Sequence, residues 1–130
     1  MIEEIIARMD SDTTLLVFGD HGMTQDGNHG GGSELELRTV LFAFQKTPFP
    51  MHEVYAKNED SFAFLDSKVK LSDLPAMVSV LLDLPFPFSN LGIFHPIFAY
   101  TNNVKRVHEL YIENLEQIYT FVSEYCRVTE

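Results

Sequence analysis

Short apolar runs alternate with polar and glycine-rich stretches along the chain, and the spacing within each run predicts its secondary structure. Residues 1–9 place Ile and Met at helical spacing between charged residues, which predicts the end of an amphipathic helix. The β-branched and apolar run 13–18 is typical of a strand buried on both faces, and 39–44 is a second apolar strand. A helix that leads into a buried strand favours an α/β fold.

The second half of the chain has a helical pattern. Apolar residues at helical spacing predict a helix that begins at the N-cap Ser72 and stops before Pro85. The proline-rich segment 85–92 is predicted to be a rigid turn, and the apolar positions of 104–125 predict a final amphipathic helix of several turns. A weaker pattern predicts a short extended piece at 61–65.

Between the two predicted strands lies the segment 19–33, which holds six glycines together with Asp, His and Asn side chains. Open α/β sheets bind ligands beyond the carboxyl ends of their strands, where this loop is expected to lie. Asp20, His21 and His29 are flanked by glycines, and carboxylate oxygen and imidazole nitrogen are ligands for zinc. A turn with Asx-type hydrogen bonds is the structural alternative, but the second glycine-flanked histidine favours a metal.

Composition and charge exclude several classes of protein. The 130 residues are 45% hydrophobic, so disorder is not expected, and the length suits one domain or part of a larger one. The net charge is −10, and the only adjacent basic pair is Lys105–Arg106, so no nucleic-acid partner is expected. The acidic first 37 residues suit either a cation or a solvated face.

Cysteine content and hydropathy exclude further kinds of site and segment. A single cysteine, Cys126, allows neither an intrachain disulfide nor a cysteine-based zinc site. The longest apolar stretch, 74–88, is broken by prolines and an aspartate and falls short of the roughly 18 residues of a spanning helix. The first residues lack the basic region of a signal peptide, so none is expected there.

The glycine-rich loop and its flanks also resemble a known family. The segment Thr14–Thr24, followed by Gly27–Gly31, closely resembles the metal-binding segment of the alkaline-phosphatase superfamily, and within it the ethanolamine-phosphate transferases of glycosylphosphatidylinositol (GPI) anchor assembly. The continuation Gly31–Leu37 is most similar to the member that modifies the third mannose. The stretch Asp73–Gly92 agrees with the family, as does a pattern on the final helix formed by Asn114, Gln117, Phe121 and Tyr125.

This resemblance implies a phosphotransferase in which two zinc ions clamp the attacking and leaving oxygens of a phosphoryl group. Asp20 and His21 would bind the zinc that also holds a threonine nucleophile, and His29 would bind the second zinc. The family moves phosphoethanolamine from phosphatidylethanolamine to a mannose of the GPI precursor glycolipid, on the lumenal side of the endoplasmic reticulum membrane. A small membrane partner subunit is a further expectation from the family.

The resemblance also implies what lies outside the chain. The family's nucleophile segment, its later Asp-His motif with two further ligands and its membrane spans are absent from residues 1–130. The chain is therefore expected to be the carboxyl-terminal part of a lumenal alkaline-phosphatase-like domain, with a mostly parallel sheet flanked by helices and no catalytic nucleophile of its own. Two alternatives are a nucleotide pyrophosphatase or phosphodiesterase of the same superfamily and a noncatalytic zinc-binding fragment.

The remaining conspicuous residues have structural interpretations. Ser33 is predicted to be an N-cap or turn residue rather than a nucleophile, and Cys126 a partly buried apolar residue. The phenylalanine-rich segment 86–98 is predicted to pack in a core rather than to contact lipid. Surface or helix-face roles are predicted for three scattered histidines: His52, His95 and His108.

Overall fold

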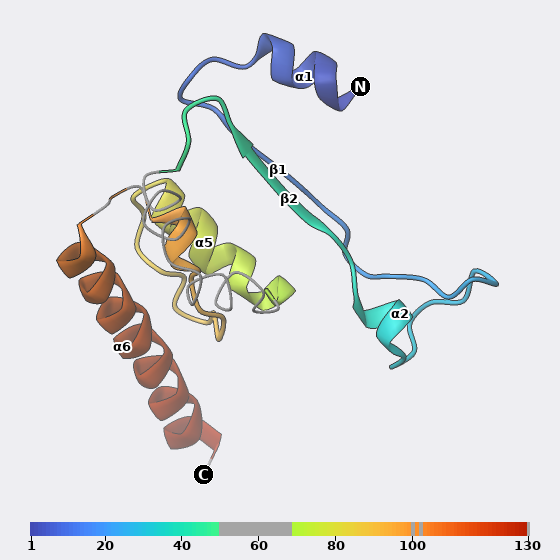
Figure 1. Ribbon diagram of the computed structural model, residues 1–130. Helices are drawn as coiled ribbons and strands as arrows, with labels where there is room; N and C mark the ends of the chain where they lie inside the picture. The colour runs from blue at the N-terminus through green and yellow to red at the C-terminus, as the bar shows by residue number, and fades with distance from the viewer. Residues whose placement is uncertain (50–68, 100, 102, 130) are drawn as a thin grey trace. The chain divides into compact units, whose positions relative to one another are not determined.

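The computed structural model describes residues 1–49, 69–99, 101 and 103–129. The chain divides into two compact units, residues 1–48 and 49–130, and each unit has its own secondary structure (Figure 1). The predicted extended piece at 61–65 and the predicted surface residue His52 lie outside the described residues. Among the described residues, no helix is both long enough and apolar enough to cross a lipid bilayer.

The first unit consists of helix α1 (Ile2–Arg8), strand β1 (Thr14–Phe18), the one-turn helix α2 (Glu34–Leu37) and strand β2 (Leu41–Gln45). The predicted helix at the start of the chain is confirmed, with acidic residues in its first turn and Arg8 in its last, as the helix dipole favours. Both predicted strands are confirmed as well, with ends shifted by one or two residues.

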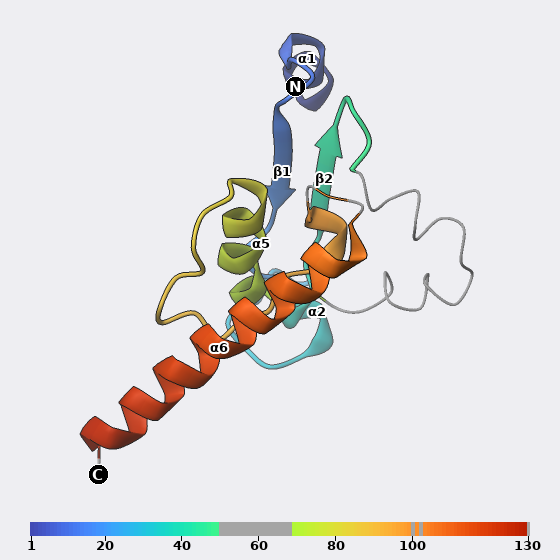
Figure 2. The same ribbon diagram turned by 90° about the vertical axis from the view of Figure 1, so that its left-hand side faces the viewer.

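The two strands form an antiparallel pair, in which Thr14 lies opposite Gln45 and Phe18 opposite Leu41. Figures 1 and 2 show β1 and β2 side by side. We expected a mostly parallel sheet, but these two strands are antiparallel. The unit does combine helices with a sheet. The strands are half-buried rather than buried on both faces, because the described part of the unit places no third strand or long helix against them.

Backbone hydrogen bonds across the base of the loop explain the antiparallel return. The N–H of Gly19 donates to the carbonyl of Val40 (3.2 Å), and the N–H of Gly22 donates to the carbonyl of Glu36 (2.7 Å). A Cβ atom at Gly22 would lie 2.0 Å from the carbonyl oxygen of Leu35, so only glycine allows the two chain segments to come this close. The chain thus folds back beside itself instead of crossing over to a parallel position.

The second unit contains the 3-10 turn η1 (Leu71–Asp73), helix α5 (Leu74–Leu81), the 3-10 turn η2 (Pro96–Phe98) and the long helix α6 (Val104–Thr129). The two predicted helices are confirmed. The predicted N-cap Ser72 is wrong, because Ser72 lies within η1 and the residue that precedes α5 is Asp73. The Asp73 carboxylate instead accepts a hydrogen bond from the N–H of Lys70 (2.8 Å), which closes the 3-10 turn.

The core of this unit forms where α5, η2 and the first half of α6 meet the connecting segment 84–95. Phe94 and Phe98 are buried, which confirms the core prediction for these two phenylalanines, whereas Phe88 is 56% exposed. The ring of Phe94 packs on Tyr111 of α6 with centroids 4.5 Å apart. The buried apolar residues of this core are Ala76, Met77, Val80, Phe94, Phe98, Ala99, Val107 and Leu110.

Side chains of α6 hold the predicted turn 85–92 in place. The Gln117 amide donates to the carbonyls of Phe88 (2.7 Å) and Asn90 (2.9 Å). Asn114, which is 1% exposed, accepts from the N–H of Phe94 (3.1 Å) and donates to the carbonyl of Gly92 (3.3 Å). Two polar residues of the family pattern on this helix therefore satisfy backbone groups of the turn.

Three predicted surface or packing roles can be compared with the structure. His108 is exposed on α6, as predicted. His95 is half-buried and precedes η2, where its ring accepts a hydrogen bond from the N–H of Ile97 (3.4 Å). Cys126 is exposed, so its predicted partial burial is wrong, because the buried residues of α6 are confined to the first half of the helix.

Candidate metal centre

The glycine-rich loop is ordered by its own turn. The N–H of Thr24 donates to the carbonyl of Asn28 (3.0 Å), and the N–H of Asn28 donates to the Thr24 hydroxyl (2.9 Å). Gly27 and Gly30 both have φ of 88°, a conformation that other residues rarely adopt. The loop therefore has both the side-chain hydrogen bonds of the turn interpretation and the positive φ angles that wrapping an ion requires.

This turn brings the two histidines of the loop together. The rings of His21 and His29 are stacked, with centroids 5.1 Å apart and planes 3° from parallel. Both side chains are exposed, so an ion arriving from solvent meets no barrier of packed side chains. The turn therefore places two imidazole rings side by side at one exposed point of the loop.

The tautomer of His21 follows from one hydrogen bond. Its Nδ1 lies 2.7 Å from the carbonyl oxygen of Gly22. Because a carbonyl only accepts, Nδ1 carries the proton and donates, and the lone pair of a neutral imidazole is left on Nε2. Metal-binding histidines usually have this arrangement, in which one ring nitrogen is fixed by the protein and the other faces the ion.

Asp20 lies on the side of His21 that carries this lone pair. Its Oδ2 is 3.7 Å from His21 Nε2, while its Oδ1 accepts from the N–H of His21 (3.1 Å). Ligands about 2.0–2.2 Å from a tetrahedral zinc are about 3.3–3.6 Å apart, so this pair of atoms is close to the spacing that one ion needs. The Asp20 side chain is 89% exposed, which leaves it free to adjust.

The three predicted ligands do not complete a site by themselves. Among the residues that the structure describes, no group of three or more His, Cys, Asp and Glu side chains is placed to hold a metal ion. Asp20 pairs with His21, and His21 stacks on His29, but the three do not converge on one point. Their assignment as metal ligands stays a prediction, and further ligands would have to come from outside the described residues.

A capping box fixes the far end of the loop. Ser33 is the N-cap of α2, as predicted, and its hydroxyl donates to Glu36 Oε2 (2.5 Å). The other Glu36 oxygen accepts from the N–H of Gly31 (3.0 Å). The hydroxyl of Ser33 and the N–H groups of Ser33 and Gly31 stabilise the carboxylate and lower the pKa of Glu36.

The helix α2 itself was not predicted, although Ser33 with Glu36 three residues later is its sequence signal. Sequence reasoning therefore missed the roles of Gly31 and Glu36, whose hydrogen bond joins the end of the loop to the capping box.

Comparison with known proteins supplies the family. No protein-family model matches the chain, and no solved structure matches it. The chain is 42% identical over 93 residues to GPI ethanolamine phosphate transferase 3 of Eremothecium gossypii, an alignment that covers 70% of this chain and 9% of that protein. It is 33% identical over 140 aligned residues to the mouse GPI ethanolamine phosphate transferase 3 catalytic subunit, which covers all of this chain and 12% of that protein.

A differently numbered member of the group also matches. GPI ethanolamine phosphate transferase 2 of Aspergillus fumigatus is 32% identical over 114 residues, which covers 82% of this chain and 14% of that protein. These relatives are transferases by name, and the match includes the glycine-rich loop and both units where it covers the whole chain. The chain belongs to the GPI ethanolamine phosphate transferase family, and it spans about a tenth of the length of the relatives that it matches.

Proposed function

We propose that this chain is part of an enzyme that moves phosphoethanolamine from phosphatidylethanolamine to a mannose of the GPI-anchor precursor, in a two-zinc mechanism on the lumenal side of the endoplasmic reticulum membrane. The observation that carries the proposal is the 42% identity to a GPI ethanolamine phosphate transferase 3. The third mannose is the proposed acceptor, because the continuation Gly31–Leu37 is most similar to the family member that modifies this mannose.

Within this proposal, the loop residues hold the metal ions. Asp20 and His21 would bind one zinc ion through Oδ2 and Nε2, and His29 would bind the second. The carbonyl of Gly22 keeps a proton on His21 Nδ1, so that the lone pair of the neutral ring lies on Nε2. When bound, zinc ions supply positive charge that stabilises the phosphoryl oxygens as bonds to phosphorus change.

The nucleophile is proposed to lie outside this chain, and the hydroxyls of the loop support that view. The Thr24 hydroxyl donates to the carbonyl of Asn28 (3.1 Å) and accepts from its N–H. The Ser33 hydroxyl is bonded to Glu36 in the capping box, and the Thr13 hydroxyl is bonded to Asp10. Each of these hydroxyls already serves the local structure.

The two alternative functions differ from the transferase in their substrates. A nucleotide pyrophosphatase or phosphodiesterase would hydrolyse nucleotide substrates, and a noncatalytic fragment would bind zinc without turnover. The comparisons favour the transferase, because the curated relatives described above are all named as GPI ethanolamine phosphate transferases.

Replacement of His21 in the full-length protein tests the proposal. We expect His21→Ala to lower transfer from phosphatidylethanolamine to a mannose-containing GPI acceptor by at least about 100-fold and to lower the zinc content, because a site that loses a ligand holds its metal weakly. The matched control is His108→Ala, an exposed histidine of α6, which should keep both activity and zinc.

Transfer at the wild-type rate by the His21→Ala protein would remove this residue from the metal site. Hydrolysis of nucleotides by the wild-type protein, with no transfer of phosphoethanolamine, would support the pyrophosphatase or phosphodiesterase instead. Mass spectrometry of the native protein gives the zinc count for each variant independently of activity.

A further inference from the structure

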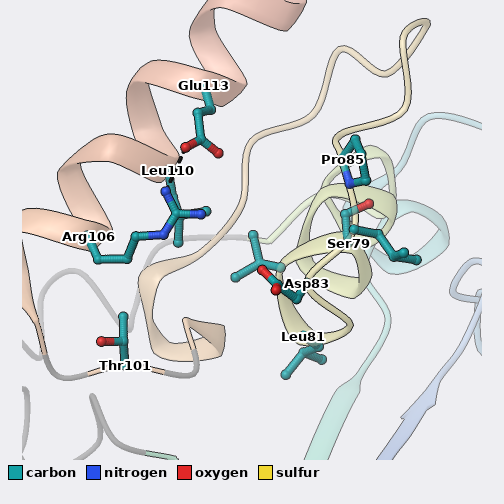
Figure 3. A pocket seen from close by; sticks show the side chains of 10 residues that line it. Ser79, Leu81, Asp83, Pro85, Thr101, Arg106, Leu110 and Glu113 are labelled. Carbon is teal, nitrogen blue, oxygen red and sulfur yellow. Dashed lines mark hydrogen bonds and ion pairs between the residues drawn. The ribbon is translucent and has the colours of Figure 1, made fainter.

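A cavity of about 610 Å³ lies in the second unit, between the carboxyl end of α5 and the first turns of α6 (Figure 3). This volume is in the range of pockets that hold small molecules. Apolar side chains of both helices form part of its wall, and charged groups face it from both sides. The lining residues that matter for its chemistry are Val80, Asp83, Leu84, Arg106, Leu110 and Glu113.

Asp83 has an unusual position on this wall. It follows Leu82, the C-cap of α5, and has φ of 51°, the only positive φ of a non-glycine residue in the described part of the chain. An anion at the carboxyl end of a helix is also unfavourable, because the helix dipole is negative there. Its carboxylate has no hydrogen bond or ion pair with any described residue, and it points across the cavity toward α6 (Figure 3).

One backbone carbonyl at this end of α5 lacks its helical donor. The carbonyl of Leu81 cannot receive the usual helical hydrogen bond from four residues later, because that residue is Pro85, which has no N–H. The carbonyls of Ser79 and Val80 are already used by the N–H groups of Leu84 (2.8 Å) and Asp83 (3.3 Å). The carboxyl end of α5 therefore has two acceptors without a donor in the described part of the chain, the Asp83 carboxylate and the Leu81 carbonyl.

The opposite wall does not offset this negative charge. Arg106 Nη1 lies 2.6 Å from Glu113 Oε1 and 3.6 Å from Glu109 Oε2, so its guanidinium is held by two carboxylates. Glu109 is also paired with Lys105 (3.7 Å), so Asp83, Glu109 and Glu113 together with Lys105 and Arg106 have a net charge of −1. A ligand that enters the cavity thus meets unbalanced negative charge.

We propose that this cavity binds a small primary ammonium compound with a short apolar chain, whose ammonium group donates to Asp83. A primary ammonium supplies three donors for the carboxylate and the free carbonyl, and Val80, Leu84 and Leu110 suit an apolar chain. A metal ion fits less well, because no group of three ligating side chains exists in the described residues. A quaternary ammonium fits less well too, because no aromatic side chain is among the residues that line the cavity.

The proposal goes beyond the proposed transfer reaction and does not depend on it. The cavity lies wholly within residues 79–113 of the second unit, whereas the predicted zinc ligands belong to the first. Loss of zinc or of transfer activity in the His21→Ala protein should therefore leave ammonium binding unchanged.

Saturation-transfer NMR on the purified full-length protein tests the proposal with butylammonium as the probe and butan-1-ol as its neutral match. We expect butylammonium to bind at least about tenfold more tightly than the alcohol, because a charge-assisted hydrogen bond contributes more than a neutral one. Asp83→Asn should bring butylammonium down to the level of the alcohol. Asparagine also tolerates positive φ, so the helix end is kept.

The control variant is Glu116→Gln, an exposed carboxylate on α6 that does not line the cavity, and it should bind butylammonium as the wild type does. Thermal unfolding of the Asp83→Asn protein should be unchanged or shifted upward, because an anion is removed from the negative end of α5. Equal binding of the two probes, no binding of either, or full binding by the Asp83→Asn protein would each overturn the proposal.

Discussion

The side chain of Asn114 connects α6 to the segment 92–94 by hydrogen bonds. Its carboxamide accepts from the N–H of Phe94 and donates to the carbonyl of Gly92, and all three residues are buried. Its amide also lies 3.4 Å from the Gln117 side-chain oxygen, so the two polar residues support each other. An apolar residue here would leave the buried N–H of Phe94 without a partner, while the carbonyl of Gly92 would keep only its bond from the Asn90 amide (3.0 Å).

Replacement of Asn114 by alanine should therefore destabilise the second unit. We expect Asn114→Ala to lower the free energy of unfolding by about 1–3 kcal/mol, since the buried N–H of Phe94 loses its acceptor and the carbonyl of Gly92 loses one of its two donors. Urea unfolding measures the loss, and amide exchange at Phe94 locates it. Ser123→Ala, an exposed position on the same helix, is the control; equal stability of the two variants would show that the carboxamide contributes little.

For single residues, the sequence predicts the chemical role of a side chain more reliably than its position and hydrogen-bond partners. Ser33 was predicted as an N-cap or turn residue, and it is one, because a hydroxyl three residues before a glutamate forms a local capping box. The proton on His21 Nδ1 could not be predicted, because it depends on where the carbonyl of Gly22 points. The convergence of Asp20, His21 and His29 on metal ions stays a prediction for the same reason.

At the scale of elements, α2 and the loop before it depend on one ionised carboxylate. Glu36 receives the Ser33 hydroxyl and the N–H groups of Ser33 and Gly31, and these bonds lower its pKa below the usual 4.5. A lowered pKa in the folded state means that ionised Glu36 stabilises the cap. That stabilisation is fully present above pH 4.5 and is lost as the pH falls through the lowered pKa.

We therefore expect the amides of Gly31 and Ser33 to lose protection as the pH is lowered below 4.5, while the β1–β2 amides keep theirs. Glu36→Gln should weaken protection of the same two amides at neutral pH and remove its dependence on pH. NMR measurement of amide exchange across a pH series reads both effects. Protection that stays constant down to pH 3 would contradict this account, since the carboxylate would then be dispensable.

Helices and strands with strong periodicity were predictable, and the connections were not. The apolar positions of α6 repeat over several turns, so its existence followed from the sequence, as did α1 and both strands. The antiparallel pairing of the two strands was not predicted, because it is decided by backbone contacts at Gly19 and Gly22 that no apolar pattern records. The one-turn helix α2 is too short for periodicity, and only its cap could have revealed it.

At the scale of the whole molecule, the 130 residues are expected to lack transfer activity when they are produced alone. A catalytic zinc usually has three protein ligands, whereas the loop offers three predicted ligands for two ions. An assay of the purified chain with zinc, phosphatidylethanolamine and a mannose-containing acceptor checks this expectation. Zinc-dependent transfer by the isolated chain would require a nucleophile within it, and Thr13, Thr14, Thr24 and Ser33 would then be tested.

The combination of helices with a sheet could be inferred from the sequence, whereas the mostly parallel sheet of the expected α/β fold stays a prediction. The family followed from a short stretch of unusual residues in the loop. The superfamily fold remains a prediction, because two strands do not define a larger sheet. The packing of the second unit could not be predicted, since it depends on hydrogen bonds between residues 20 and 22 positions apart. The spacing of apolar residues predicts which face of a helix or strand is buried, but not which distant backbone groups its polar side chains bind.

The two hydrogen bonds from Gln117 also impose an order on folding. They reach back 29 residues to Phe88 and 27 residues to Asn90, so the segment 85–92 receives these partners only after the first half of α6 has been synthesised. Long-range contacts of this kind form late, because the intervening loop must close before they contribute. A ribosome-bound chain that has emerged only as far as Gly92 should therefore display this segment unanchored and open to chaperones, and should become protease-resistant there once Gln117 emerges.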